Sequence, residues 1–119
     1  MNYLVGDIGN TLTKICLINK NSKIIKEYSI ETNKLFVNTN LYKFFTSFLK
    51  KNIKKKILFS SVVPNIYNKI NKFLTSKNFK SFEIKNLPLK RIIKINIDAY
   101  KQLGSDRIAN AISAFNLFK

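Results

Sequence analysis

The stretch YLVGDIGNTLTK, residues 3 to 14, decides how the chain begins to fold. Its apolar start predicts a short strand over residues 3–5 that ends at Gly6 and Asp7, and the residues of the following Gly-Asn-Thr segment are typical of tight turns. From residue 11 to residue 19 the side chains alternate with the period of two that a strand requires. One face of this second strand is expected to carry Leu12, Lys14, Cys16 and Ile18, and the other Thr13, Ile15 and Leu17. The stretch therefore predicts a β-hairpin.

The rest of the chain alternates between strand and helix patterns. A third antiparallel strand is predicted over residues 24–30, and a helix from Asn40, with Asn38, Thr39 and Asn40 as candidate caps. A buried strand over 57–63, a helix opened by Pro64, a brief strand over 82–84 and a helix after Gly104 follow. Three strands, then helix, strand, helix, strand and helix predict one α/β domain around a mixed five-stranded sheet.

Length and composition exclude several classes of protein. The chain has 119 residues, the size of one domain, and 45% of them are hydrophobic, which favours a folded core over disorder. No apolar run approaches the roughly 18 residues that cross a bilayer, and the start lacks a signal-peptide layout, so we expect a cytoplasmic protein with no membrane partner. Cys16 is the single cysteine and histidine is absent, which excludes a Cys–His nucleophile and favours a buried structural thiol.

The net charge of +16 raises the question of a polyanionic partner. The lysines are spread along the chain, and only Arg91 and Arg107 supply the guanidinium groups that dominate specific phosphate and base recognition. We therefore interpret most of the charge as a solvated surface and expect no specific nucleic-acid partner. A basic nucleic-acid-binding domain remains an alternative, based on the dense run formed by Lys50, Lys51, Lys54, Lys55 and Lys56.

The hairpin also carries chemistry. Glycine lets backbone N–H groups turn inward as an anion-binding nest, and the Thr11 hydroxyl and Lys14 ammonium add donors for a phosphate chain. Asp7 would repel phosphates unless a cation intervenes, and Mg²⁺ bound by a carboxylate supplies that cation. The alternative interpretation is an ordinary hairpin in which Asp7 caps the turn.

A second group of residues lies in GSDRIANAISAF, residues 104–115. Ser105 and Asp106 are ordinary capping residues at a helix start, but Gly104 permits close approach of a ligand and Arg107 can clamp an anionic group. An ionised carboxylate at a helix N-terminus is suited to accept a proton from an alcohol. Between the two groups lies SSVVP, residues 60–64, which a buried strand followed by a helix-start proline explains fully.

Together, DIGNT with Thr13 and Lys14, SSVVP, and GSDRIANAISAF resemble the type III pantothenate kinases, a bacterial branch of the actin-like superfamily of sugar kinases, acetate kinases and heat-shock ATPases. The resemblance covers residues 2 to about 118. It implies a ribonuclease H-like fold and ATP-dependent phosphorylation of pantothenate to 4′-phosphopantothenate, the first step of coenzyme A synthesis. It also implies a homodimer that uses Mg²⁺ and a monovalent cation, K⁺ or NH₄⁺.

The resemblance assigns roles to individual residues. It makes Asp106 the catalytic proton acceptor and Asp7 the metal ligand. The family's substrate tyrosine falls at Ile97 here, and Tyr100 is the candidate to replace it. The pantothenate-binding residues implied are Tyr100, Gly104, Ser105, Asp106 and Arg107, and the phosphate-binding segment implied is Asp7, Ile8, Gly9, Asn10, Thr11, Leu12, Thr13 and Lys14.

The family has two similar domains with ATP between them, and residues 1–119 correspond to the N-terminal actin-like ATPase domain. We therefore expect the second domain, with the monovalent-cation ligand, to be absent from this chain and activity to depend on it. A non-catalytic regulatory or binding module on the same fold is the alternative. The presence of Asp7, Thr11, Lys14 and Asp106 argues against it.

Overall fold

A mixed five-stranded sheet forms the centre of the protein. The computed structural model describes residues 2–21, 23–49 and 53–84. The strands are β1 (Asn2–Ile8), β2 (Leu12–Ile18), β3 (Ile24–Glu31), β4 (Ile53–Ser61) and β5 (Lys80–Glu83), in the spatial order β3-β2-β1-β4-β5. β1 and β3 pair antiparallel with β2, while β4 runs parallel to β1 and to β5. This arrangement confirms the predicted α/β class and the mixed sheet.

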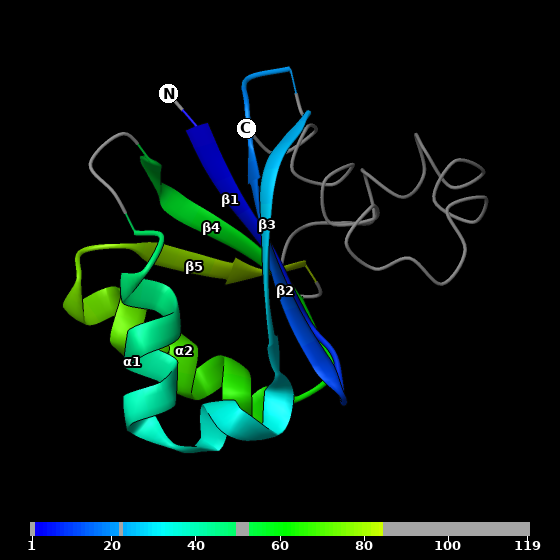
Figure 1. Ribbon diagram of the computed structural model, residues 1–119. Helices are drawn as coiled ribbons and strands as arrows, with labels where there is room; N and C mark the ends of the chain where they lie inside the picture. The colour runs from blue at the N-terminus through cyan, green and yellow to red at the C-terminus, as the bar shows by residue number, and fades with distance from the viewer. Residues whose placement is uncertain (1, 22, 50–52, 85–119) are drawn as a thin grey trace.

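Two helices, α1 (Asn38–Thr46) and α2 (Pro64–Ser76), pack on the same face of this sheet (Figure 1). α2 begins with Pro64 at its first turn, where a missing N–H costs no hydrogen bond. Its buried stripe contains the predicted Ile66, Ile70, Phe73 and Leu74, together with Tyr67. The helix predicted after Gly104 lies outside the described residues.

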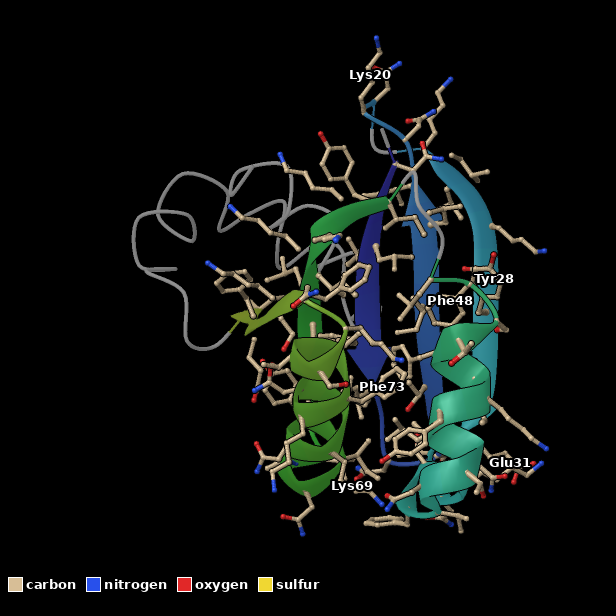
Figure 2. All side chains as sticks on the ribbon, turned by 90° about the vertical axis from the view of Figure 1, so that its left-hand side faces the viewer. Lys20, Tyr28, Glu31, Phe48, Lys69 and Phe73 are labelled. Atoms are coloured by element: carbon tan, nitrogen blue, oxygen red, sulfur yellow. The ribbon has the colours of Figure 1, made fainter. Side chains whose placement is uncertain are left out.

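The core on the helix-covered face is rich in aromatic side chains. Phe45 of α1 and Phe48, two residues after this helix ends, belong to one buried cluster with Ile15 of β2 and Phe59 of β4. The ring of Tyr28 on β3 stacks on Phe48 with centroids 4.5 Å apart (Figure 2). A second cluster occupies the other face of the sheet and contains Val5, Cys16, Ile18, Leu58 and Ile84. The two clusters confirm the predicted alternation along β2 and the buried position of Cys16.

β1 does not end at Gly6 and Asp7 as the sequence predicted, but continues to Ile8. A Cβ atom on Gly6 would lie within 2.5 Å of Phe59 Cδ1 and 2.8 Å of Ile15 Cδ1. The glycine is therefore in the strand because a phenyl ring covers its backbone, and it does not mark the end of the strand.

The connection before α1 also differs from the prediction. A 3₁₀ helix, η1 (Thr32–Phe36), precedes α1, whose N-cap is Val37 with no side-chain capping bond. The candidate cap Asn38 lies inside the helix, and Asn40 uses its side-chain amide to donate to the Lys34 carbonyl at 3.1 Å. The side chain of Asn40 therefore bonds to a backbone carbonyl of η1 and does not cap α1.

Candidate functional site

The candidate site lies where β1 and β4 end side by side. Because these strands are parallel, their carboxyl ends meet at one edge of the sheet, and Val62 N–H donates to Ile8 O at 3.0 Å just beyond them. The turn between β1 and β2, residues 9–11, lies at this edge. We call these three residues the β1–β2 turn. The carboxyl end of parallel strands is where α/β sheets generally bind ligands.

Three polar residues form a row across neighbouring strands beside this turn. Asp7 of β1 is the register partner of Lys14 on β2 and of Ser60 on β4. By strand alternation from Val5 and Cys16, this row lies on the face of the sheet opposite the two helices. Asp7 is 9% exposed, while Lys14 and Ser60 are half-buried. Near the carboxyl ends of β1 and β4, this face of the sheet therefore carries a polar row. It consists of a carboxylate with an ammonium group on one neighbouring strand and a hydroxyl group on the other.

The turn offers backbone donors at Asn10 and Thr11. Gly9 N–H donates to Leu12 O at 3.0 Å, so the Gly9 amide closes the turn and is not available to a ligand. Asn10 and Thr11 are exposed, and their backbone N–H groups donate to no acceptor among residues 2–21, 23–49 and 53–84. Gly9 therefore cannot contribute its N–H to the predicted anion-binding nest, and the backbone donors that the turn leaves for this prediction are those of Asn10 and Thr11.

Two members of the predicted phosphate-binding segment, Ile8 and Thr13, face the helix side of the sheet. Ile8 is fully buried in the core there, whereas Leu12 is 38% exposed and shares the face of Lys14. Thr13 is fully buried on the helix side, so its hydroxyl points away from the face that carries Lys14. Side chains of this segment that lie at the site face or on the exposed turn are those of Asp7, Asn10, Thr11, Leu12 and Lys14.

Thr32, the first residue of η1, was missed by the sequence analysis. Its N–H donates to Thr11 O at 2.9 Å, and its hydroxyl donates to Gly9 O at 2.7 Å. The same hydroxyl oxygen lies 2.9 Å from Thr13 Oγ1. No local pattern signals this role, because the partners lie about twenty residues apart in the chain. Ser60 was also missed, and its only signal was its place in SSVVP.

The predicted substrate-binding residues are not placed by the structure. Tyr100, Gly104, Ser105, Asp106 and Arg107 all lie outside the described residues. Among the described residues, the candidate site therefore comprises the predicted phosphate-binding segment together with β4 and the start of η1.

The donor set fits a magnesium ion held together with a phosphate chain. Within the described ranges, no three His, Cys, Asp or Glu side chains gather, so no all-protein metal cage is present there. Mg²⁺ usually keeps several waters and is bound by one or two carboxylates plus substrate phosphates. Asp7, which lies beside a turn whose Asn10 and Thr11 N–H groups have no acceptor among the described residues, fits that requirement.

The described elements form an α/β domain around a mixed five-stranded sheet, with a polar turn at the carboxyl end of β1. A family model described as type III pantothenate kinase matches residues 3–119, and the chain belongs to that family.

The chain is similar to the type III pantothenate kinase of Pelagibacter ubique (strain HTCC1062), with 45% identity over 95% of this chain and 46% of the relative. The corresponding protein of Thermosipho africanus (strain TCF52B) is 34% identical over 93% of this chain and 44% of its own length. The chain thus spans about half the length of the curated relatives it matches. Among the described helices, none has the length and apolar character needed to span a membrane.

Proposed function

We propose that this chain supplies the phosphate-binding half of an enzyme that transfers the γ-phosphoryl group of ATP to the primary hydroxyl of pantothenate. The row of Lys14, Asp7 and Ser60 beside the exposed β1–β2 turn is the observation that carries this proposal. Family membership and the names of the relatives support the choice of substrates. The product is 4′-phosphopantothenate, which makes the reaction the first step of coenzyme A synthesis.

On the phosphate side, each group has a simple electrostatic task. The N–H groups of Asn10 and Thr11 donate to phosphate oxygens, and the Lys14 ammonium neutralises part of their charge. Asp7 would hold Mg²⁺, which neutralises negative charge on the phosphates when it is bound. The half-buried position of Lys14 strengthens its attraction for an anion, because water screens it less than an exposed lysine.

On the pantothenate side, the roles follow from the family resemblance of residues 104–107. Asp106 accepts the proton of the pantothenate hydroxyl. The hydroxyl oxygen then forms the new bond to the γ-phosphorus as the bond between that phosphorus and the leaving ADP oxygen breaks. Arg107 pairs with the pantothenate carboxylate. Tyr100 takes the place of the family's substrate tyrosine.

The whole enzyme needs a second half. Phosphoryl transfer depends on positioning and charge stabilisation from both sides of the nucleotide. We therefore propose that the active protein is a homodimer of complemented chains in the cytoplasm, and that it uses a monovalent cation, K⁺ or NH₄⁺, held by the second half.

The test combines this chain with the segment of the Pelagibacter ubique relative that lies outside the matched region, and measures ATP-dependent phosphorylation of pantothenate. Asp106→Asn retains a capping side chain, so the melting temperature should hardly change. Turnover should fall by roughly two to four orders of magnitude, the usual contribution of a general base. Arg107→Ala should instead raise the KM for pantothenate. An Asp106→Asn protein that unfolds with no selective loss of rate would show that Asp106 is only a helix cap.

A further inference from the structure

The β1–β2 turn is held from behind by a buried chain of hydroxyl groups. A threonine hydroxyl has one proton, and that of Thr32 is donated to Gly9 O at 2.7 Å. In the 2.9 Å contact between the two threonines, Thr13 must therefore be the donor. The resulting order of donation is Thr13 to Thr32 to Gly9 O. Thr32 is 1% exposed and Thr13 is fully buried, so water does not compete with these bonds.

This chain fixes the direction of one backbone donor on the opposite side of the turn. The Gly9 carbonyl and the Asn10 N–H belong to the same peptide unit, which is trans. In a planar trans peptide the C=O and N–H bonds point in opposite directions. Because Thr32 pulls the Gly9 carbonyl inward, the Asn10 N–H points outward, where Asn10 is exposed.

A second bond from the same residue restrains the other end of the turn. Thr32 N–H donates to Thr11 O at 2.9 Å, so the carbonyls on both sides of Asn10 are tied to one residue of η1. The turn residues themselves include a glycine and an asparagine, which tolerate several backbone conformations. Without the hydrogen bonds to Thr32, nothing in the local sequence would hold the Gly9–Asn10 peptide in a single orientation.

We infer that Thr32 is a positioning residue for phosphate binding: its hydroxyl holds the Gly9–Asn10 peptide so that the Asn10 N–H faces the phosphate chain of ATP. The inference rests on the proposed function. It predicts that the hydroxyl, rather than the volume of the side chain, determines the affinity for ATP.

The test uses the complemented enzyme and three substitutions. Thr32→Val preserves shape but removes the hydroxyl, and Thr32→Ser preserves the hydroxyl but removes the methyl group. Thr46→Val, at an exposed position in α1, is the matched control. Thr32→Val should raise the KM for ATP by about tenfold, the effect of one lost donor to a charged group, with the KM for pantothenate unchanged. Thr32→Ser and Thr46→Val should stay within about twofold of the unsubstituted enzyme.

Thermal unfolding separates this role from simple stability. If Thr32→Val does not fold, Thr32→Ala replaces it, because the smaller side chain admits water to Gly9 O, and the same rise in the KM for ATP is expected. A KM for ATP within twofold of the unsubstituted enzyme in the folded variant would overturn the inference, as would equal impairment by serine. An unsubstituted complemented enzyme with no turnover would instead overturn the proposed function itself.

Discussion

The two turns of the β1-β2-β3 meander are held in different ways. The β2–β3 turn, residues 19–23, is closed by its own side chain: Asn19 Oδ1 accepts from the N–H groups of Asn21 at 2.9 Å and Lys23 at 3.1 Å. The β1–β2 turn is held by Thr32, which is 23 residues away from Gly9. Figure 2 shows Lys20 of the β2–β3 turn at the top and Glu31 near the bottom. Glu31 is the register partner of Leu12, which follows the β1–β2 turn, so the two turns lie at opposite ends of the strands.

The β2–β3 turn only reverses the chain, whereas the β1–β2 turn also exposes backbone hydrogen-bond donors. An Asx-type turn consumes its N–H groups within itself and needs no distant support. In the β1–β2 turn the N–H groups of Asn10 and Thr11 have no acceptor among the described residues, and the buried hydroxyls of Thr13 and Thr32 hold the Gly9 carbonyl behind the turn. Exposed backbone donors supported by a remote buried residue therefore distinguish the β1–β2 turn, for which we propose phosphate binding, from the β2–β3 turn.

The largest effect on the phosphate side is expected from Asp7→Asn. The substitution preserves shape but removes the charge that would hold Mg²⁺, so ATP binding should lose its dependence on Mg²⁺. Turnover should fall by at least about a hundredfold, since the charge stabilisation supplied by a metal is worth several kcal/mol. The control is Glu27→Gln on β3, which changes a carboxylate of the same sheet away from the site. Calorimetric titration of ATP with and without Mg²⁺ measures the effect, and a retained Mg²⁺ dependence in Asp7→Asn would contradict the assignment.

A smaller effect is expected when the lysines of the two turns are compared. Lys14→Met should raise the KM for ATP by roughly tenfold to a hundredfold, the value of a charge-assisted contact to phosphate. Lys20→Met should change the KM for ATP by less than about twofold. Lys20 follows Lys14 by six residues, four in β2 and two in the β2–β3 turn, so it lies up to about 20 Å from Lys14, beyond the screening length in physiological salt. Steady-state kinetics of the two variants decide the matter. Equal effects would mean that ATP responds to overall charge and not to the site.

The sequence pattern predicted most of the fold for a physical reason. Alternation along residues 11–19 reports which side chains meet the core, and the structure confirms both faces of β2. Pro64 and the apolar spacing after it gave the start and the buried face of α2. These features depend on neighbours in the chain, and a sequence pattern contains that information.

What the sequence did not predict depends on contacts between distant residues. Gly6 was interpreted as the end of a strand. The reason for the glycine is the ring of Phe59, which comes from β4 and leaves no signal in the sequence around Gly6. Thr32 carried no local signal, because its partners Gly9 and Thr13 belong to the first hairpin. Thr13 was assigned to the phosphate-binding segment by its position in the motif, although the alternation along β2 already placed it on the face opposite Lys14. The structure shows that this face is the one the helices cover.

The next effect is confined to stability. Asn19→Ala removes an acceptor of two hydrogen bonds in the β2–β3 turn and should lower the free energy of unfolding by about 1 kcal/mol. The melting temperature should fall by roughly 5 °C, and the KM for ATP should not change. Thermal unfolding and kinetics of the same sample provide the two readings. A clear loss of ATP affinity would mean that the two turns are not functionally separate.

The smallest effect on activity is expected from the lysines of β4. Lys54, Lys55 and Lys56 are exposed, and replacing all three by glutamine should leave the KM for ATP within about twofold because exposed charges are screened by salt. Any binding of DNA or RNA by the unsubstituted chain should be non-specific and should collapse between low and physiological salt. A sequence-specific complex that survives physiological salt would show that the charge is more than a solvated surface.

The central claim is that the β1–β2 turn, and not the β2–β3 turn, binds the phosphate chain. The most direct measurement is an amide NMR titration, with ATP and Mg²⁺, of the isotope-labelled chain combined with the Pelagibacter ubique segment used in the complementation test. We predict that the backbone amides of Asn10 and Thr11 shift progressively with ATP, whereas those of Asn21 and Lys23 do not move. Equal shifts at both turns, or none at Asn10 and Thr11 while the enzyme turns over, would contradict the account.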